Sequence, residues 1–242
     1  MNRGLSLPAT VMAWFALVMI TGDLAWVWPA KAEPQNIGVL AADLDAYVDE
    51  GRYFSDIVEA VSGAQAKVAQ RLRHKRSNER LAIVLDVDET ALSNLSEIQA
   101  NGYAYFEELP CPITRGVPSS PCGFAAWAQS GAAPAIEATL DLYRFARDQG
   151  VAVFFVSNRA ETLRDATSRN LRSAGFDRWD GLVLEPAAAN FESAADFKSA
   201  ERKTIEAKGY TIILTMGDQW SDLLGGAAEA WVKLPNPFYY IP

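Results

Sequence analysis

The chain has 242 residues, of which 50% are hydrophobic and 21% are charged, so its composition is that of a globular protein and excludes wholesale disorder. A chain of this length forms one or two domains and buries a core without disulfide or metal staples. The 22 basic and 30 acidic residues give a net charge of −8, which has the wrong sign for a protein that binds nucleic-acid phosphates. We therefore expect no nucleic-acid partner.

The N-terminal residues have the pattern of a secretory signal peptide. Arg3 precedes an uncharged apolar run at 11–20 (VMAWFALVMI), and residues 30–32 (AKA) form a cleavage signal of the AxA type. We expect residues 1–32 to be removed, which leaves a mature chain of residues 33–242 that is periplasmic or secreted and has no stable membrane anchor. An uncleaved anchor is the alternative, but the apolar run is about half as long as the roughly 20 residues that a membrane span needs.

Apolar periodicity after the signal peptide predicts helices that alternate with short strands. The predicted strands are 81–85 (LAIVL), 151–156 (VAVFFV), 182–184, 211–216 (TIILTM) and, more weakly, 231–234. The predicted helices are 53–73, 135–148, 161–174, 197–208 and 220–228. Strands that alternate with helices predict an α/β fold with a doubly wound parallel sheet and helices on both faces.

The segment at about 100–133 breaks this alternation with prolines, glycines, both cysteines and several aromatic residues. We interpret it as a small cap inserted into a single domain that spans residues 33–242. Cys111 and Cys122 are expected to form a disulfide, because export leads to an oxidising compartment and the number of cysteines is even. A reactive thiol is the alternative, but the Cys-to-Arg spacing of cysteine phosphatases is missing here.

Polar clusters follow three of the predicted strands. They are DVDET at 86–90, SNR at 157–159 and GDQWSD at 217–222. Sites in doubly wound sheets open at the carboxyl ends of the strands, so we expect these clusters to converge in space. Taken singly, each cluster is explained equally well as a helix cap or a turn. Independent caps have little reason, however, to follow successive strands in this order.

The acidic residues of these clusters are suited to phosphoryl chemistry. Asp86 and Asp88 lie two residues apart at a strand end and can point into one pocket, Asp86 as a nucleophile and Asp88 as an acid and base. One histidine and two cysteines are too few for an ordinary zinc site, whereas carboxylate oxygens suit Mg²⁺. We expect Mg²⁺ to be held by Asp86, Asp218 and a backbone carbonyl, with Asp222 as a further candidate ligand.

A phosphoryl group also needs donors and positive charge around its oxygens. Ser157 and its neighbouring N–H groups are expected to bind the phosphoryl oxygens. Lys198 is the best candidate for the cation that binds them. Lys203 lies further inside the same predicted helix and should face away. Thr90 and Asn158, from the same motifs, are further candidates for phosphate binding.

At this point the sequence resembles the haloacid dehalogenase (HAD) superfamily. The four motifs of that superfamily appear as DVDET at 86–90, Ser157, Lys198 and GDQWSD at 217–222. The longer strings are similar to subfamily IIIB, which holds secreted class C bacterial acid phosphatases, plant acid phosphatases and vegetative storage proteins. They are DVDETALSN, FKSAERK, GYTIILTMGDQWSDL and KLPNPFYYIP. The likeness runs from about Gly51 to the C-terminus.

The resemblance implies an α/β Rossmann-like core with a small cap and a Mg²⁺-dependent phosphomonoesterase. It implies that Asp86 is the nucleophile and Asp88 the acid/base, and that Ser157 and Lys198 bind the phosphoryl group. By the same match the metal is held by Asp86, the Asp88 carbonyl and Asp218, with Asp222 as a ligand or next to one.

We therefore expect an exported Mg²⁺-dependent acid phosphatase that hydrolyses small phosphomonoesters through an aspartyl-phosphate, and that is compatible with a homo-oligomer. A phosphotransferase on the same scaffold is one alternative, and a storage or binding protein without turnover is another, although Asp86 is retained. Aromatic residues are candidates to stack on the substrate, although most should belong to the core. These are Tyr103, Tyr105, Phe106, Trp127, Tyr239 and Tyr240.

Overall fold

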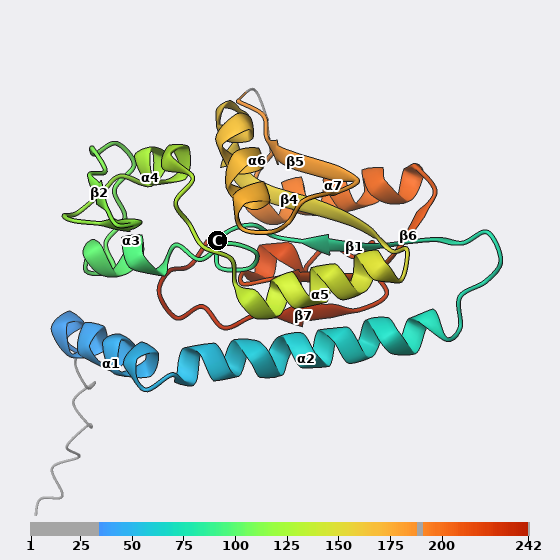
Figure 1. Ribbon diagram of the computed structural model, residues 1–242, viewed down its shortest axis with the longest axis horizontal. Helices are drawn as coiled ribbons and strands as arrows, with labels where there is room; N and C mark the ends of the chain where they lie inside the picture. Colours follow the sequence, from blue (N-terminus) through green and yellow to red (C-terminus); the bar gives the residue numbers. More distant parts are fainter. Residues whose placement is uncertain (1–33, 188–190, 242) are drawn as a thin grey trace, which may run out of the picture. The chain divides into compact units, whose positions relative to one another are not determined.

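Five parallel strands form the central sheet of the protein, in the order β5-β4-β1-β6-β7 (Figure 1). The computed structural model describes residues 34–187 and 191–241, and those from Asn36 onward form one compact unit. The predicted signal peptide at 1–32 lies outside the described residues. The strands of the sheet are β1 (Arg80–Leu85), β4 (Ala152–Ala160), β5 (Gly181–Glu185), β6 (Tyr210–Gly217) and β7 (Trp231–Lys233).

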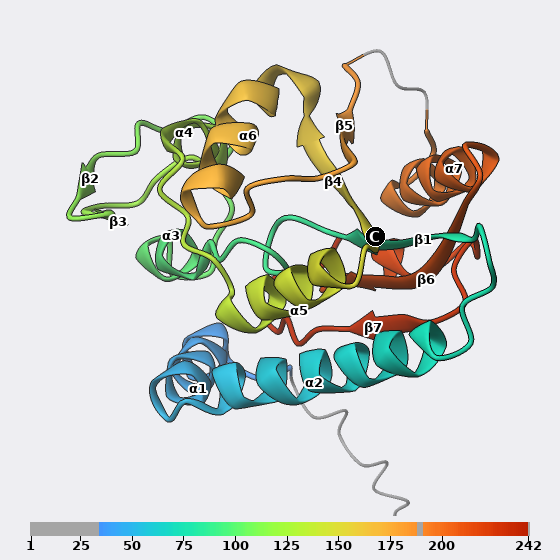
Figure 2. The same cartoon turned by 45° about the vertical axis from the view of Figure 1, so that its right-hand side comes forward.

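Helices cover both faces of this sheet (Figures 1 and 2). Helices α2 (Arg52–Leu72) and α5 (Glu137–Asp148) contact one face, and α7 (Ala194–Ala207) contacts the other. Successive side chains of β1 point to opposite faces of the sheet, and both faces are apolar. Ile83 packs in the cluster with α2 and α5, whereas Val84 packs in the cluster with α7. The predicted doubly wound α/β fold is therefore confirmed.

Most of the predicted elements are present with small shifts of their ends. The predicted helix at 161–174 begins as a 3₁₀ turn, η1 (Glu161–Leu163), and continues as α6 (Arg164–Ser173). Helix α1 (Ile37–Asp49) was not predicted, and Val48 is its only fully buried residue, so little apolar periodicity marks it in the sequence. No helix within 34–187 and 191–241 has both the length and the apolar character needed to cross a membrane.

The predicted helix at 220–228 is wrong, because only a 3₁₀ turn, η2 (Trp220–Asp222), forms there. Gly225 and Gly226 follow with φ angles of +88° and +75°, which a right-handed helix excludes. A side chain satisfies three backbone carbonyls of this segment instead, since the Arg202 guanidinium donates to those of Asp222 at 2.7 Å, Gly226 at 3.1 Å and Leu224.

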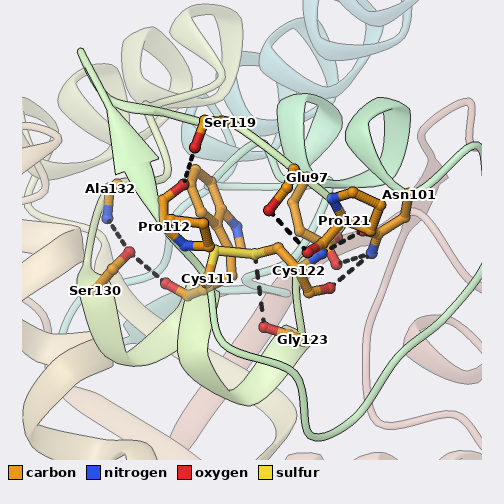
Figure 3. Close-up of a disulfide and its surroundings, with 12 residues drawn as sticks. Glu97, Asn101, Cys111, Pro112, Ser119, Pro121, Cys122, Gly123, Ser130 and Ala132 are labelled. Atoms are coloured by element: carbon orange, nitrogen blue, oxygen red, sulfur yellow. Dashed lines mark hydrogen bonds between the residues drawn. A yellow bond between two sulfur atoms is a disulfide. The ribbon is translucent and has the colours of Figure 1, made fainter.

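The segment between β1 and α5 lies beside the carboxyl ends of the strands (Figure 1), and its residues 95–133, which include the predicted insertion at about 100–133, are called the cap below. They contain α3 (Leu95–Ala100), a hairpin of β2 (Ile113–Thr114) and β3 (Val117–Pro118), and α4 (Phe124–Ser130). Cys111 and Cys122 form the predicted disulfide inside this segment (Figure 3). The side chain of Asn101, at the end of α3, accepts from the Cys122 N–H at 2.7 Å and donates to its carbonyl at 2.9 Å, so the disulfide loop is held against α3.

Candidate active site

A pocket of about 510 Å³ opens at the carboxyl ends of β1, β4 and β6, between the sheet and the cap. The three polar clusters meet there, as the parallel topology requires. The pocket is lined by Asp86, Asp88, Glu89, Asn94, Glu97, Ile98, Tyr103, Ala104, Tyr105, Phe124, Ser157, Asn158, Arg159, Lys198, Asp218, Gln219, Phe238, Tyr239, Tyr240 and Ile241.

The end of β1 places two carboxylates in this pocket. The Asp86 N–H still donates to the carbonyl of Met216 at 3.0 Å, as the last ladder bond of the strand. The chain then turns sharply, with Glu89 at a φ of +49°, and the N–H groups of Ala91 and Leu92 both donate to the Val87 carbonyl. Asp86 and Asp88 thereby leave the pleat of the strand and both line the pocket.

Lys198, on the second turn of α7, reaches across to Asp86. Its Nζ lies 2.8 Å from Asp86 Oδ1 and also pairs with Asp222, and all three side chains are buried. Burial alone would lower the pKa of Lys198, but the charges of Asp222 and Asp86 outweigh it and raise this pKa, so the ammonium remains charged. Lys203 is exposed on the same helix, as expected.

Three buried carboxylates crowd together beside Lys198. Oxygens of Asp86, Asp218 and Asp222 all lie within 4.8 Å of one another. Burial raises the pKa of Asp218 to about 6, with a further rise from the charge of Asp222, and burial also raises the pKa of Asp86 against the opposing effect of Lys198. Hard oxygen ligands and an excess of negative charge at this spot fit a divalent cation.

Neighbouring groups fix the orientation of these carboxylates. Asp218 accepts hydrogen bonds from the side chains of Gln219 and Asn236, each at 2.7 Å. Asp222 accepts from the Gln219 N–H at 2.8 Å, and its carboxylate lies against Gly217, where an added Cβ would come within 2.1 Å of Oδ2. The absence of a side chain at Gly217 therefore allows Asp222 to reach the cluster.

Asp88 is held from two sides by residues of the pocket. The Arg159 guanidinium forms an ion pair with it at 2.7 Å, and the Asn94 side chain donates to it at 2.7 Å. Burial alone would raise the pKa of Asp88, but Arg159 and the hydrogen bond from Asn94 lower it. Trp127 of the cap in turn donates to Asn94 at 2.8 Å, which links the cap to this carboxylate.

The predicted phosphate-binding residues occupy different positions. Ser157 and Asn158 line the pocket, and the buried amide oxygen of Asn158 has no hydrogen-bond partner in the described part of the chain. Thr90 does not line the pocket; its hydroxyl lies 3.3 Å from an oxygen of Asp218 and so contacts a candidate metal ligand.

Sequence reasoning assigned no role to several residues of the site. Arg159 stood in the SNR cluster, and Asn94 stood in the string DVDETALSN, so their proximity to the motifs was the available signal. Glu89 is buried, with its pKa raised to about 8 by burial and by the charges of Asp88 and Asp218. Its carboxylate accepts from the Asn94 N–H at 2.5 Å.

Aromatic side chains form much of the outer pocket. Of the aromatic residues considered from the sequence, four line it, and these are Tyr103, Tyr105, Tyr239 and Tyr240. Phe124 and Phe238 join them. Phe106 is not among the lining residues, and Trp127 is fully buried and holds Asn94 instead.

Two plant proteins are similar to this chain in sequence. Acid phosphatase 1 of Solanum lycopersicum is 36% identical over 161 residues, which make up 65% of this chain and 58% of that protein. Vegetative storage protein 1 of Arabidopsis thaliana is 31% identical over 160 residues, which make up 66% of this chain and 55% of that protein. The matches thus cover little more than half the length of these relatives.

A solved structure shares the fold. The class C acid phosphatase from Bacillus anthracis superposes with a TM-score of 0.65 at 20% sequence identity, over 84% of this chain and 86% of that one. The family model described as HAD superfamily, subfamily IIIB (acid phosphatase) matches residues 17–242. The motif order, the fold and this match agree, and the chain belongs to subfamily IIIB of the HAD superfamily, the acid phosphatases.

Proposed function

We propose that the protein is a Mg²⁺-dependent acid phosphatase that hydrolyses small phosphomonoesters through an aspartyl-phosphate on Asp86. The observation that carries this proposal is the meeting of Asp86, Asp88, Lys198 and Asp218 in one buried pocket. They come from three separate segments of the chain, and each has a part in phosphoryl transfer that its position allows.

In the first step a carboxylate oxygen of Asp86 attacks phosphorus, and the bond from phosphorus to the leaving oxygen breaks. Lys198 holds Asp86 Oδ1 at 2.8 Å and keeps a positive charge beside the phosphoryl oxygens. Asp88 passes a proton to the leaving oxygen, which departs as an alcohol; because Arg159 keeps Asp88 ionised in the free protein, this proton is taken up when the phosphomonoester binds as its monoanion. The Ser157 hydroxyl and the backbone N–H groups beside it would donate to the phosphoryl group, since Ser157 and Asn158 line the pocket at the end of β4.

In the second step Asp88 takes a proton from water, which attacks phosphorus and releases Asp86 and inorganic phosphate. Arg159 and Asn94 hold Asp88 in position for both proton transfers. Asp86, Asp218 and the carbonyl of Asp88, with Asp222 beside them, would hold Mg²⁺. When bound, this ion supplies charge neutralisation of the phosphoryl oxygens and reduces their repulsion from Asp86.

We further propose that residues 1–32 direct export and that the mature protein, residues 33–242, works in the periplasm or outside the cell. The disulfide between Cys111 and Cys122 supports this proposal, because such bonds persist in oxidising compartments.

A protein without turnover is the second candidate, because two relatives are named as vegetative storage proteins. The retained pocket argues against it: the Asp86, Asp88 and Lys198 side chains all line one cavity.

The test is an assay of the chain from residue 33 on p-nitrophenyl phosphate and a panel of phosphomonoesters, with Mg²⁺ and with EDTA. We expect activity that EDTA removes, and a fall of about 10³-fold or more for Asp86→Asn, since the nucleophile is lost. Asp148→Asn, the same change at an exposed position on α5, should leave activity unchanged. Turnover by Asp86→Asn would overturn the covalent mechanism, and turnover in EDTA would overturn the metal requirement. Added alcohol distinguishes a phosphotransferase by its phosphorylated product.

A further inference from the structure

Glu97 is a pocket carboxylate that the proposed chemistry does not use. It lies on α3 of the cap, lines the pocket and is only 5% exposed. Its Oε1 accepts from the Asn101 side chain at 2.6 Å, and Asn101 is tied to the backbone of Cys122 (Figure 3). Among the residues that the structure describes, no Lys, Arg or His pairs with Glu97, and no group donates to Oε2.

A largely buried carboxylate without an ion-pair partner is costly, and a proton, water or a cation that enters the pocket can offset this cost. Burial, together with the charge of Asp88, raises the pKa of Glu97 to about 7. A ligand cation beside the carboxylate would favour its ionised form.

The cationic side chains that line the pocket already form ion pairs within the protein. Of its lining residues only Lys198 and Arg159 are cationic; Lys198 pairs with Asp86 and Asp222, and Arg159 pairs with Asp88. Lys198 stands where the phosphoryl group would bind, and Arg159 stands between Asp88 and the ring of Phe124, 5.7 Å from its centroid. The cap side of the pocket keeps the negative charge of Glu97 without compensation.

Aromatic rings line the same pocket as Glu97. Tyr103 and Phe238 stack with centroids 5.9 Å apart and planes at 17°, and Tyr105 lies 6.2 Å from Phe124. All four rings line the pocket together with Tyr239 and Tyr240. Aromatic faces attract organic cations, quaternary ammonium groups above all, and a neighbouring carboxylate adds to that attraction.

We propose that Glu97 is a specificity-determining residue that favours phosphomonoesters whose leaving group carries an organic cation. The phosphoryl group binds at Asp86 and Lys198, and the cationic group binds between the aromatic rings and Glu97. This inference rests on the proposed phosphatase function and assigns the class of leaving group.

The experiment compares two substrates of nearly the same shape, phosphocholine and 3,3-dimethylbutyl phosphate, in which a carbon replaces the charged nitrogen. We measure the ratio of their kcat/KM values at pH 7.5 with Mg²⁺, for the unaltered chain, Glu97→Gln and Glu108→Gln. Differences in intrinsic reactivity cancel when the ratios of the variants are compared. Glutamine at 97 still accepts from Asn101, and Glu108 is an exposed cap residue outside the pocket.

We expect Glu97→Gln to lower the preference for phosphocholine by about tenfold, the size of a desolvated cation contact, while Glu108→Gln keeps it. If Glu97→Gln keeps the full preference, or the unaltered chain has none, the inference is overturned. Hydrolysis of p-nitrophenyl phosphate is measured in parallel: if the unaltered chain hydrolyses no phosphate ester, the proposed function fails and the inference fails with it.

A second measurement needs no variant and covers the case in which Glu97→Gln does not fold. Choline and 3,3-dimethylbutanol are compared as inhibitors of p-nitrophenyl phosphate hydrolysis by the unaltered chain. Choline should inhibit at a concentration about tenfold lower. Equal inhibition by the two compounds would overturn the inference.

Discussion

The pairing of Arg159 with Asp88 shows how one side chain sets the state of another at this site. The guanidinium is fully buried, and it bonds to both carboxylate oxygens of Asp88 and to the Thr167 hydroxyl. It thereby offsets the cost of burying the carboxylate beside Asp86. Through its contact with Thr167, which lies on α6, Arg159 connects the turn that holds Asp88 to the helix that follows β4.

Replacing Arg159 should therefore affect both stability and turnover. Arg159→Ala leaves a buried carboxylate unpaired, so we expect a loss of about 3–5 kcal/mol in the free energy of unfolding and a large fall in kcat. Arg159→Lys should recover only part of both, because an ammonium lacks the planar fork that contacts two oxygens. Denaturant unfolding and kcat/KM measurements check this.

Arg144→Ala is the matched control, because Arg144 pairs with Asp141 in the solvent at 3.3 Å. Its loss should change the free energy of unfolding by less than about 1 kcal/mol. Equal effects of the two alanine variants would contradict the role assigned to the buried pair.

At the scale of elements, the junction of β6 and η2 decides where the acidic residues of the last motif point. Gly217 ends β6, and η2 follows at once as a short turn in which Asp222 folds back on Gln219. This contact is a capping box, in which the side chain of the third residue bonds back to the N–H of the residue before the turn. Together with the space left by Gly217, it holds the Asp222 carboxylate beside Asp86 and Asp218.

Gly217→Ala tests this junction. An added Cβ would lie 2.1 Å from the Asp222 carboxylate, so Asp222 must shift, and we expect a marked loss of activity and about 1–3 kcal/mol lower stability. Gly63→Ala is the control, since Gly63 lies inside α2 with open space around it, and alanine there should stabilise the helix by up to about 1 kcal/mol. If Gly217→Ala keeps the activity and melting temperature of the unaltered chain, the close contact of the Asp222 carboxylate with residue 217 is not needed.

For the whole molecule, the carboxylate cluster would couple the binding of a cation to folding. Asp86 follows β1, Asp218 follows β6, and Asp222 belongs to η2, so the cluster exists only when these elements are assembled. A cation that binds the cluster therefore binds the folded chain alone and stabilises it.

We expect Mg²⁺ to raise the melting temperature, with a gain of about 2.7 kcal/mol at a concentration of 100 times the dissociation constant. EDTA should reverse the gain, and Asp218→Asn should weaken it strongly because one ligand is lost. Thermal unfolding with and without Mg²⁺ measures both effects. An equal response in Asp218→Asn would place the ion elsewhere.

The sequence by itself determined the sheet, the family and the order of the motifs. Apolar runs such as 81–85 are local signals of buried strands, and parallel strands bring their carboxyl ends to one edge, so the meeting of the polar clusters followed from topology alone. Helical spacing places Lys198 and Lys203 on different faces of one helix, which is why Lys203 was expected to face away. In the structure Lys198 is buried and Lys203 is exposed.

Only the tertiary structure decided which polar groups pair. Arg159 and Asp88 are 71 positions apart, and no local pattern specifies their contact. Glu97 reads in the sequence as an ordinary polar residue of a helix, yet the cap turns it toward the pocket without a cation. The physical reason is that periodicity reports burial along a single element, whereas pairing between charges depends on distances that exist only after several elements have packed together.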